Sequence, residues 1–334
     1  MVPISVIMSV YKEPIDWLKQ SIDSILHQTF SNFEFIIICD YPSYTEGLEL
    51  LKEYEKLDHR IILLINEENI GLTKSLNRGL KVAQGKYIAR MDADDISDLH
   101  RLELQYKYME EAPDITVCGT GRKVLNEDRE TSKTYNTYTR DGDIKSVFVL
   151  RSAFTHPTVM FRHSIIDEGY SYDESFICAQ DYDLWERLYE KGCCFANIDL
   201  PLLRYRMSDI QVSKNKKEIQ VANAKRIRKR FLTSMDIHLR DEELNLLVLP
   251  FAKNMRVSRQ DIENYVRLLS RLQYEMKKHE WFNSKAYQTE AVRFAINLAL
   301  HSKQRWSSLW SVFCSSLMNF SVLKNNIGYY YHRI

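Results

Sequence analysis

The sequence predicts an α/β protein with a mainly parallel sheet flanked by helices, followed by a helical C-terminal extension. Three observations support this prediction. From residue 3 to residue 119, short apolar runs alternate with longer segments of helical periodicity, a pattern typical of parallel strands joined by crossover helices. An acidic cluster directly follows one of the apolar runs. Beyond about residue 210 only helical periodicity continues.

The first half of the chain alternates regularly between the two kinds of element. Four apolar runs predict buried strands, at residues 4–10, 33–39, 60–65 and 87–91. Four segments have the apolar spacing of helices, at residues 15–27, 45–56, 72–83 and 98–111. In the last of these helices we expect burial of four residues, Leu99, Leu102, Tyr106 and Met109.

The region after residue 115 predicts a mixed arrangement. Short strands are expected near four segments, 115–125, 155–161, 194–198 and 202–206. A helix from about 180 to 191 has Leu184, Trp185 and Leu188 on its inward face. We therefore expect a catalytic domain over residues 1–213 and a helical extension over residues 214–334.

Composition excludes several classes of protein. The chain has 334 residues with a formal charge of +1, so no global basic field indicates a nucleic-acid partner. The six cysteines contain no CxxC pair, which argues against a disulfide framework or a zinc site. The N-terminus runs directly into an apolar strand without the basic region of a signal peptide. A cytoplasmic protein is expected.

The strongest local signal is Asp92-Ala93-Asp94-Asp95, which follows the apolar run at 87–91. In open α/β sheets ligands bind beyond the carboxyl ends of the strands. Clustered carboxylates repel one another unless a cation or hydrogen bonds compensate them, and oxygen ligands suit Mg²⁺ or Mn²⁺. The alternative is structural, since Asp95 could cap the helix that begins near residue 98.

The second signal is Asp181, within the segment that opens the helix at 180–191. A carboxylate there is favoured by the helix dipole whether or not it reacts. A single carboxylate about ninety residues after a metal-type cluster also suits a general base that accepts a proton from an acceptor hydroxyl. Both interpretations stay open on the residues alone.

Seven blocks, in this order and at these intervals, resemble the family 2 glycosyltransferases: PISVIMSVY (3–11), SILHQTF (24–30), NIGL (69–72), NRGL (77–80), GKYI (85–88), DADD (92–95) and QDYDLW (180–185). The resemblance covers roughly residues 3–213. It implies a GT-A fold, a nucleotide-diphosphate sugar donor such as a UDP-sugar, a divalent metal (Mg²⁺ or Mn²⁺), and inversion at the anomeric carbon.

The resemblance also implies roles for individual residues. Ser9 and Tyr11 match positions that line the nucleoside pocket, and Asp40 matches the acidic strand end that approaches the base. Asp92 matches the residue directed towards the ribose, and Asp94 the residue directed towards the metal and the diphosphate.

Asp181 matches the catalytic base of the family. The chain departs from the family at three positions: Cys39 stands where an Asp is usual, Gln180 where a Glu is usual, and Ser208 where a His can join the metal shell. Two further residues, Arg206 and His156, resemble family elements near the phosphate and the acceptor, and packing roles remain open for both.

Two segments of the extension suggest where an acceptor would be found. Residues 214–234 hold eight basic residues and one acid, and Trp306, Trp310, Phe313, Leu317 and Phe320 recur at helical spacing in segment 306–323. Basic and aromatic residues of this kind favour an anionic membrane surface. We expect a saccharide acceptor, lipid-linked, at the inner face of the plasma membrane; a solvated helical face is the alternative.

The function predicted from these signals is inverting, metal-dependent transfer of a sugar to a saccharide hydroxyl in the synthesis of a bacterial surface polysaccharide such as capsule or O-antigen. Two other classes remain. A nucleotidyltransferase that makes nucleotide-sugars also uses an α/β sheet and acidic metal ligands, although the chain has no Gly-rich triphosphate loop near its first strand. A non-catalytic nucleotide-sugar-binding scaffold is the third.

Overall fold

The computed structural model describes residues 2–318 except 127, 128, 136, 208–216 and 252–256, together with residue 322. The chain divides into two compact units. The first comprises residues 1–139 and 154–211, and the second comprises residues 140–153 and 212–334. Residues 140–153, which the sequence analysis assigned to the catalytic domain, thus group with the C-terminal helices.

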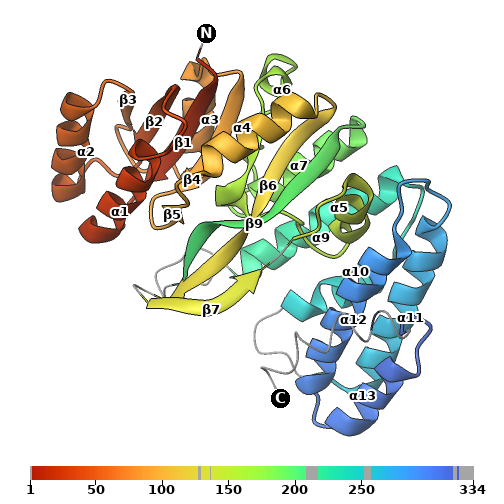
Figure 1. Ribbon diagram of the computed structural model, residues 1–334. Coiled ribbons are helices and arrows are strands. Elements are labelled where there is room, and N and C mark those ends of the chain that lie inside the picture. Colours follow the sequence, from red (N-terminus) through yellow and green to blue (C-terminus); the bar gives the residue numbers. More distant parts are fainter. Residues whose placement is uncertain are drawn as a thin grey trace. The chain divides into compact units, whose positions relative to one another are not determined.

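The first unit is built on one sheet flanked by helices (Figure 1). Its strands are β1 (Ile4–Val10), β2 (Phe33–Cys39), β3 (Ile61–Ile65), β4 (Tyr87–Asp92), β5 (Ile96–Ser97), β6 (Ile115–Asn126), β7 (Arg129–Tyr135), β8 (Met160–Arg162) and β9 (Cys194–Met207). Along the sheet they lie in the order β3-β2-β1-β4-β8-β6-β9-β5, and β7 pairs with β6. The expected α/β fold with a helical C-terminal part is confirmed.

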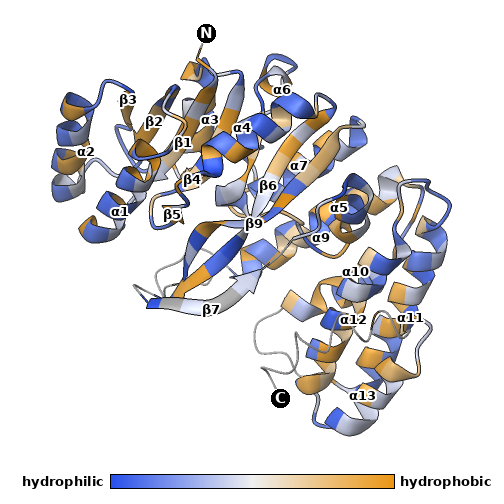
Figure 2. Ribbon diagram, in the orientation of Figure 1, coloured by the Kyte–Doolittle hydropathy of each residue, from blue (hydrophilic) through white to orange (hydrophobic). Residues whose placement is uncertain are grey.

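The helices of this unit are α1 (Ile15–Leu26), α2 (Thr45–Leu57), α3 (Leu72–Val82), α4 (Arg101–Glu111), α6 (Ser164–Asp167) and α7 (Gln180–Glu190), with a 3-10 turn η1 at His156–Thr158. In Figure 2 strands β1 and β2 are largely orange, whereas the helices alternate between orange and blue, as expected of helices with one buried side.

Side-chain alternation along β1 explains how both faces of the sheet are covered. Val6 and Met8 are buried in a cluster with residues of α1, α2 and α4. Ile7 points the other way, since a Cβ placed on Gly79 of α3 would lie 2.8 Å from it. Strands β1, β2 and β4 are parallel neighbours, so their carboxyl ends meet at one edge of the sheet.

The predicted elements of the first half occur nearly as expected, and the differences lie after the acidic cluster. Strand β5 was not predicted, and α4 begins at Arg101 rather than at residue 98. The predicted burial of Leu99 is wrong: this side chain is 49% exposed, because it lies in the turn before α4. The two strands expected at 194–198 and 202–206 form the single strand β9.

The second unit is helical. Its helices are α5 (Asp141–Phe148), α9 (Lys217–Ser234), α10 (Asp241–Val248), α11 (Arg259–Met276), α12 (Ser284–Leu300) and α13 (Arg305–Phe313), with a 3-10 turn η2 at Leu249–Phe251. Among the described residues, no helix combines the length and the hydropathy that crossing a bilayer requires.

Helix α5 is held firmly within this unit. Its residues Ile144 and Phe148 are fully buried, and the Phe148 ring packs edge-on against Phe231 of α9 at 6.3 Å. Asn283 Nδ2 donates a hydrogen bond to Asp143 Oδ1 at 2.6 Å. The second unit is therefore assembled from two separate stretches of the chain.

Candidate active site

The residues predicted to bind the donor gather at the carboxyl ends of β1, β2 and β4. Ser9 is the register partner of Asp92 across β1 and β4, and Val10 is the partner of Cys39 across β1 and β2. Tyr11 and Asp40 directly follow these strand ends. Parallel pairing thus brings three separate segments of the sequence to one edge of the sheet.

The acidic cluster is compact. Carboxylate oxygens of Asp92, Asp94 and Asp95 lie within 4.8 Å of one another. Burial, with the neighbouring charges of Asp92 and Glu13, raises the pKa of Asp94 to about 7. Burial, with the neighbouring charges of Asp94 and Asp92, also raises the pKa of Asp95 well above its ordinary value. A compact cluster of carboxylates whose pKa values are raised in this way fits a site for a hard divalent cation.

Asp95 does not cap a helix, so the structural alternative for this residue is wrong. Its Oδ1 accepts a hydrogen bond from the backbone N–H of Arg206 at 2.8 Å, while α4, with His100 as its N-cap, has no side-chain cap. Its Oδ2 is buried and has no hydrogen-bond partner within the described part of the chain. A buried, half-satisfied carboxylate supports a compensating ion nearby.

Arg206 stabilises the acidic loop at residues 92–95. Its Nε donates to the carbonyl oxygen of Asp94 at 2.7 Å, and its Nη2 donates to Gln20 Oε1 at 2.8 Å. The guanidinium lies 4.6 Å from the centre of the Trp17 ring. The side chain is fully buried, so the structural reading of Arg206 is favoured over a phosphate contact. Ser208, which stands in the same motif where the family can have a His, lies outside the described residues.

Asp40 is engaged with the loop that precedes α3. One carboxylate oxygen accepts hydrogen bonds from Asn66 Nδ2 at 2.7 Å and from the Ile70 N–H at 3.0 Å. The other accepts from the Gly71 N–H at 3.0 Å. Asp40 is only 3% exposed. It therefore orders this loop, a role that sequence reasoning did not assign to it.

Glu13 is an acidic residue of the site that sequence reasoning missed. Its Oε2 accepts a hydrogen bond from the Tyr11 N–H at 2.8 Å, and burial raises its pKa to about 7, with a further contribution from Asp92. The available signal was its position, three residues after the end of β1. Tyr11 itself is 40% exposed and packs edge-on against Tyr41.

Asp181 is the second residue of α7. Burial raises the pKa of this carboxyl to about 6, while hydrogen bonds from the Tyr182 and Asp181 N–H groups and the charge of Arg90 oppose the increase. Asp92 contributes in the raising direction, so the two carboxylates share one electrostatic environment. Arg90, which is buried, forms an ion pair with Asp92.

The N-terminus of α7 is strained. Its N-cap, Ala179, has φ 63° and ψ 23°, the left-handed conformation that residues with a Cβ rarely adopt. Behind it the helix is anchored by Trp185, which is fully buried between Phe154 and Phe161. The predicted inward face of Leu184, Trp185 and Leu188 is confirmed.

His156 and Tyr172 form a pair beside this helix. His156 Nε2 lies 2.9 Å from the Tyr172 hydroxyl. Burial lowers the pKa of His156 well below its ordinary value and raises the pKa of Tyr172, to which the charge of Asp181 also contributes. A neutral imidazole is therefore expected, and it lies near the predicted base.

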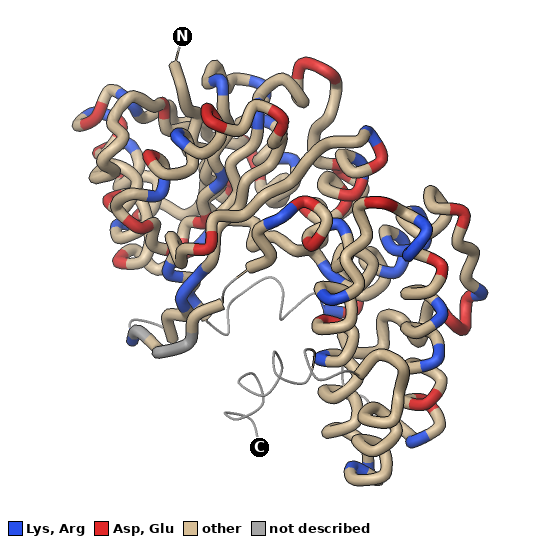
Figure 3. The backbone as a smooth tube through the Cα atoms, turned by 45° about the vertical axis from the view of Figure 1, so that its right-hand side comes forward, with Lys and Arg blue, Asp and Glu red and all other residues tan. Residues whose placement is uncertain are grey.

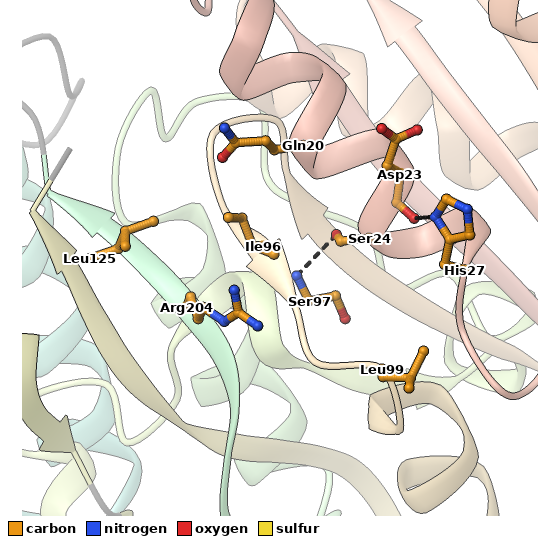
Figure 4. Close-up of a pocket in the computed structure, with 9 residues that line it drawn as sticks. All are labelled: Gln20, Asp23, Ser24, His27, Ile96, Ser97, Leu99, Leu125 and Arg204. Atoms are coloured by element: carbon orange, nitrogen blue, oxygen red, sulfur yellow. Dashed lines mark hydrogen bonds between the residues drawn. The ribbon is translucent and has the colours of Figure 1, made fainter. Parts of the chain in front are cut away.

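The structure has a separate pocket of about 540 Å³ (Figure 4). Two of its lining residues, Ile96 and Ser97, directly follow the acidic cluster in the sequence. Its lining comes from α1, the β5 region, β6 and β9, and consists of Gln20, Asp23, Ser24, His27, Ile96, Ser97, Leu99, Leu125 and Arg204. None of the predicted site residues lines it.

The chain matches the family model described as glycosyl transferase family 2 over residues 5–169. An uncharacterized glycosyltransferase of Methanocaldococcus jannaschii is 38% identical over 218 residues, which cover 64% of this chain and 75% of the relative. The O-antigen biosynthesis glycosyltransferase WbnJ of Escherichia coli is 37% identical over 215 residues, covering 64% and 82%. The crystal structure of S. aureus TarS residues 1–349 in complex with UDP-GlcNAc superimposes with a TM-score of 0.58 at 15% identity, over 90% of each chain.

Proposed function

The chain belongs to glycosyl transferase family 2, and from this membership we propose that it transfers a sugar, with inversion, from a nucleotide-diphosphate donor to a saccharide hydroxyl. The observation that carries the proposal is the placement of two kinds of carboxylate in one environment. Asp92, Asp94 and Asp95 form a compact cluster, and Asp181 experiences the charges of Asp92 and Arg90 at the start of a different helix.

Asp181 acts in this proposal as the general base. Its pKa is about 6, so the carboxyl is ionised at pH 7. Because this pKa is within about one unit of the working pH, the carboxylate is also basic enough to accept a proton. The acceptor hydroxyl gives its proton to Asp181 as its oxygen attacks the anomeric carbon from the face opposite the leaving group. A single displacement of this kind inverts the configuration and needs no covalent enzyme intermediate.

The acidic cluster acts in this proposal on the leaving group, the nucleoside diphosphate. Asp94, with Asp92 beside it, would hold Mg²⁺ or Mn²⁺, which supplies positive charge to the departing diphosphate. The chain's own contribution is to keep these carboxylates in place: Arg206 bonds the Asp94 carbonyl and Arg90 pairs with Asp92. Asp95 is the buried end of the cluster.

We propose a UDP-sugar as donor, which the TarS complex with UDP-GlcNAc makes the first compound to test. Ser9, Tyr11 and Asp92 lie at the adjoining ends of β1 and β4, where a nucleoside would meet them. Asp40 contributes by ordering the loop at Ile70 and Gly71.

A panel of nucleotide-sugars with Mn²⁺ or Mg²⁺ tests this function in two steps. A bound donor stabilises the native state by mass action, so the melting temperature should rise with UDP-sugars and metal together. UDP release from the same compounds should follow and should stop with EDTA. Binding without any release would support the scaffold alternative, and pyrophosphate release from a nucleoside triphosphate and a sugar phosphate would support the nucleotidyltransferase.

The acceptor is proposed to be a saccharide of a surface polysaccharide, because WbnJ is named as an O-antigen biosynthesis enzyme. We further propose that it is lipid-linked and met by a cytoplasmic enzyme at the inner membrane surface. Support comes from an aromatic face on α13, which we define as Trp306, Trp310 and Phe313. These side chains are 85%, 70% and 42% exposed and follow each other at helical spacing. Of the other two residues in the predicted pattern, Leu317 is buried and Phe320 lies outside the described residues.

The basic stretch supports this membrane contact less than its sequence suggested. Arg228 is buried, donates to the Leu150 carbonyl and lies 4.7 Å from the centre of the Phe251 ring, so it is a structural residue of the second unit. Lys225 bonds Asn245. Lys214 and Lys216 lie outside the described residues. Figure 3 shows both Lys or Arg and Asp or Glu along the helices of the second unit, although α9 itself carries Glu218 as its only acid. With Arg228 buried and two lysines outside the described residues, the aromatic face is the main support.

A further inference from the structure

Helix α3 carries three buried polar side chains that take no part in the acidic cluster, Thr73, Ser75 and Asn77. Ser75 accepts a hydrogen bond from Asn66 Nδ2 at 2.9 Å, and the other two have partners elsewhere. Thr73 is 5% exposed and Asn77, one turn later, is 6% exposed. Burying a hydroxyl or an amide costs free energy unless a hydrogen bond replaces the lost water. The partners of these two side chains therefore indicate what they stabilise.

Both side chains bond the segment of chain that leads into α7. Asn77 Oδ1 accepts the Tyr172 N–H at 3.1 Å, and its Nδ2 donates to the Tyr172 carbonyl at 2.8 Å. The same Nδ2 lies 3.1 Å from Glu174 Oε1. Thr73 Oγ1 donates to the Phe176 carbonyl at 2.8 Å. Helix α3 thus holds this segment at three alternate residues.

The N-terminus of α3 is also fixed to the donor side of the site. The Gly71 N–H at its N-cap, where φ is 87°, bonds the Asp40 carboxylate. Near its C-terminal end, Gly79 packs so closely on Ile7 of β1 that a Cβ would approach within 2.8 Å. Because the helix is held at both ends, it forms a rigid connection between the ends of the strands and the segment before α7.

Tyr172 extends this connection towards the acceptor. While its backbone is held by Asn77, its hydroxyl lies 2.9 Å from His156 Nε2. Both side chains are in the electrostatic environment of Arg90, which also acts on Asp181. The Asn77 amide therefore fixes the backbone of Tyr172 on both its N–H and its carbonyl, while Thr73 fixes Phe176 closer to α7.

We infer that Asn77 is a positioning residue for glycosyl transfer, which holds Tyr172 and the segment behind it so that Asp181 faces the bound donor. The inference rests on the proposed function. It assigns a second task to a helix whose N-cap and preceding residue are bonded by Asp40 on the nucleoside side. Loss of Asn77 should reduce turnover and leave donor binding intact, because the proposed donor residues lie on other elements.

The test compares Asn77→Leu with a matched control, Gln28→Leu. Gln28 is also buried, and its amide likewise accepts a backbone N–H (Leu102, 3.0 Å) and donates to a backbone carbonyl (Asp98, 2.6 Å). These partners belong to the start of α4. We expect Asn77→Leu to lower the rate constant for UDP release from UDP-GlcNAc with Mn²⁺ by about 10- to 100-fold, with UDP affinity by calorimetry within about twofold of wild type.

A second pair guards against a folding defect in Asn77→Leu. Thr73→Val keeps the shape of the side chain and removes the bond to the Phe176 carbonyl, whereas Thr73→Ser keeps the hydroxyl. Thr73→Val should slow UDP release about threefold or more, and Thr73→Ser should restore it. Amide hydrogen exchange across residues 172–181 should accelerate in Asn77→Leu and in Thr73→Val.

The outcomes separate this inference from the function on which it rests. If the wild-type protein releases UDP from no UDP-sugar, the proposed function fails and the inference with it. If the wild type is active and Asn77→Leu matches it, only the inference fails. An equal loss in Gln28→Leu, or a parallel loss of UDP affinity in Asn77→Leu, would also overturn it.

Discussion

Asp181 combines a favourable position for a carboxylate with an unfavourable environment. The N-terminus of α7 and its N–H groups stabilise the charge, yet burial outweighs them and the pKa is about 6. Asp181→Asn retains the shape and cannot accept a proton. We expect it to lower sugar transfer by at least about 100-fold without weakening UDP binding. Substantial activity in this variant, measured as UDP release, would exclude Asp181 as the base.

The same pKa predicts how the wild-type rate depends on pH. A general base must be ionised, so the rate constant should increase as pH rises through about 6 and level off above it. UDP release should be measured at saturating UDP-sugar and Mn²⁺. A rate that is flat across this range would mean that another group, or no group, removes the proton.

Asp181 also makes a prediction about stability. Its folded-state pKa is raised, so the folded protein holds this proton more tightly than the unfolded chain does. Stability is then fully present below the ordinary pKa and is lost as pH rises to about 6. Asp181→Asn avoids that loss, and its free energy of unfolding should exceed that of wild type by about 3 kcal/mol at about pH 7.5. Urea unfolding should show the difference disappearing in acid.

At the scale of elements, the start of α7, which positions the Asp181 carboxylate, has a backbone conformation that lowers the stability of the fold. Ala179 adopts φ 63°, which costs a residue with a Cβ about 1 kcal/mol. Ala179→Gly should therefore raise the free energy of unfolding by about 0.5 to 1 kcal/mol, and Ala179→Val should lower it. Urea unfolding of the two variants tests this, and a destabilised Ala179→Gly would show that the strain is absent.

Arg206 links strand β9 to the acidic loop through the Asp94 carbonyl. Outer residues that orient metal ligands affect metal affinity by about 10- to 100-fold. Arg206→Lys cannot bond Asp94, Gln20 and the Trp17 face together, so we expect Mn²⁺ affinity to fall about 10-fold. The control is Arg204→Lys, two residues earlier on the same strand. Equal Mn²⁺ affinities in a calorimetric titration of the two variants would contradict this role.

The elements that sequence reasoning found are those with a local signal. Strands β1, β2 and β4 are apolar over their whole length, and α1 to α3 have clear periodicity. Strand β5 has two residues, Ile96–Ser97, and exists only because β9 pairs with it about a hundred residues later. No window of sequence contains that partner, so periodicity could not reveal it.

The candidate site shows the same limit. Asp92, Asp94 and Asp181 could be selected because each stands in a recognisable motif. Glu13 stands in no such motif, and Asn77 stands in one, NRGL at 77–80, that gave it no role, since the importance of both depends on which backbone groups they bond. Asp40 was selected, but its bonds to the loop at Ile70 and Gly71 depend on the folded path of the chain.

At the scale of the whole molecule, the second unit includes residues 140–153 from the middle of the chain. A fragment ending at residue 213, where the sequence suggested a boundary, would lose the helices against which α5 packs. Ile144, Val147 and Phe148 would then be exposed, at a cost of about 1.5 to 3 kcal/mol for each side chain. We expect this fragment to aggregate and to bind a hydrophobic dye.

The matched control for this fragment carries serine at the same three positions. It has the same length and the same break in the chain, so improved solubility would identify α5 as the cause. Equal aggregation of both fragments would mean that the first unit needs the second for other reasons. Size-exclusion chromatography distinguishes these outcomes.

The aromatic face of α13 gives the membrane proposal its sharpest test. Its Trp residues are exposed, while Ser308 and Val312 on the other side of the helix are buried. Indole side chains partition into the bilayer interface, and Lys303 and Arg305, both exposed, would each add about 1 kcal/mol near anionic lipid. The full chain should therefore float with vesicles that contain phosphatidylglycerol, and added salt should weaken this binding.

Trp306→Ser combined with Trp310→Ser should abolish flotation, because it removes the side chains that insert into the interface. The control is Tyr274→Ser, which removes an aromatic ring that is 80% exposed on α11 and outside the aromatic face. Loss in both variants would indicate that general hydrophobicity, not this face, drives binding. Flotation that survives the double substitution would place the membrane contact elsewhere, and no flotation of the wild-type chain would leave the acceptor to be met in solution.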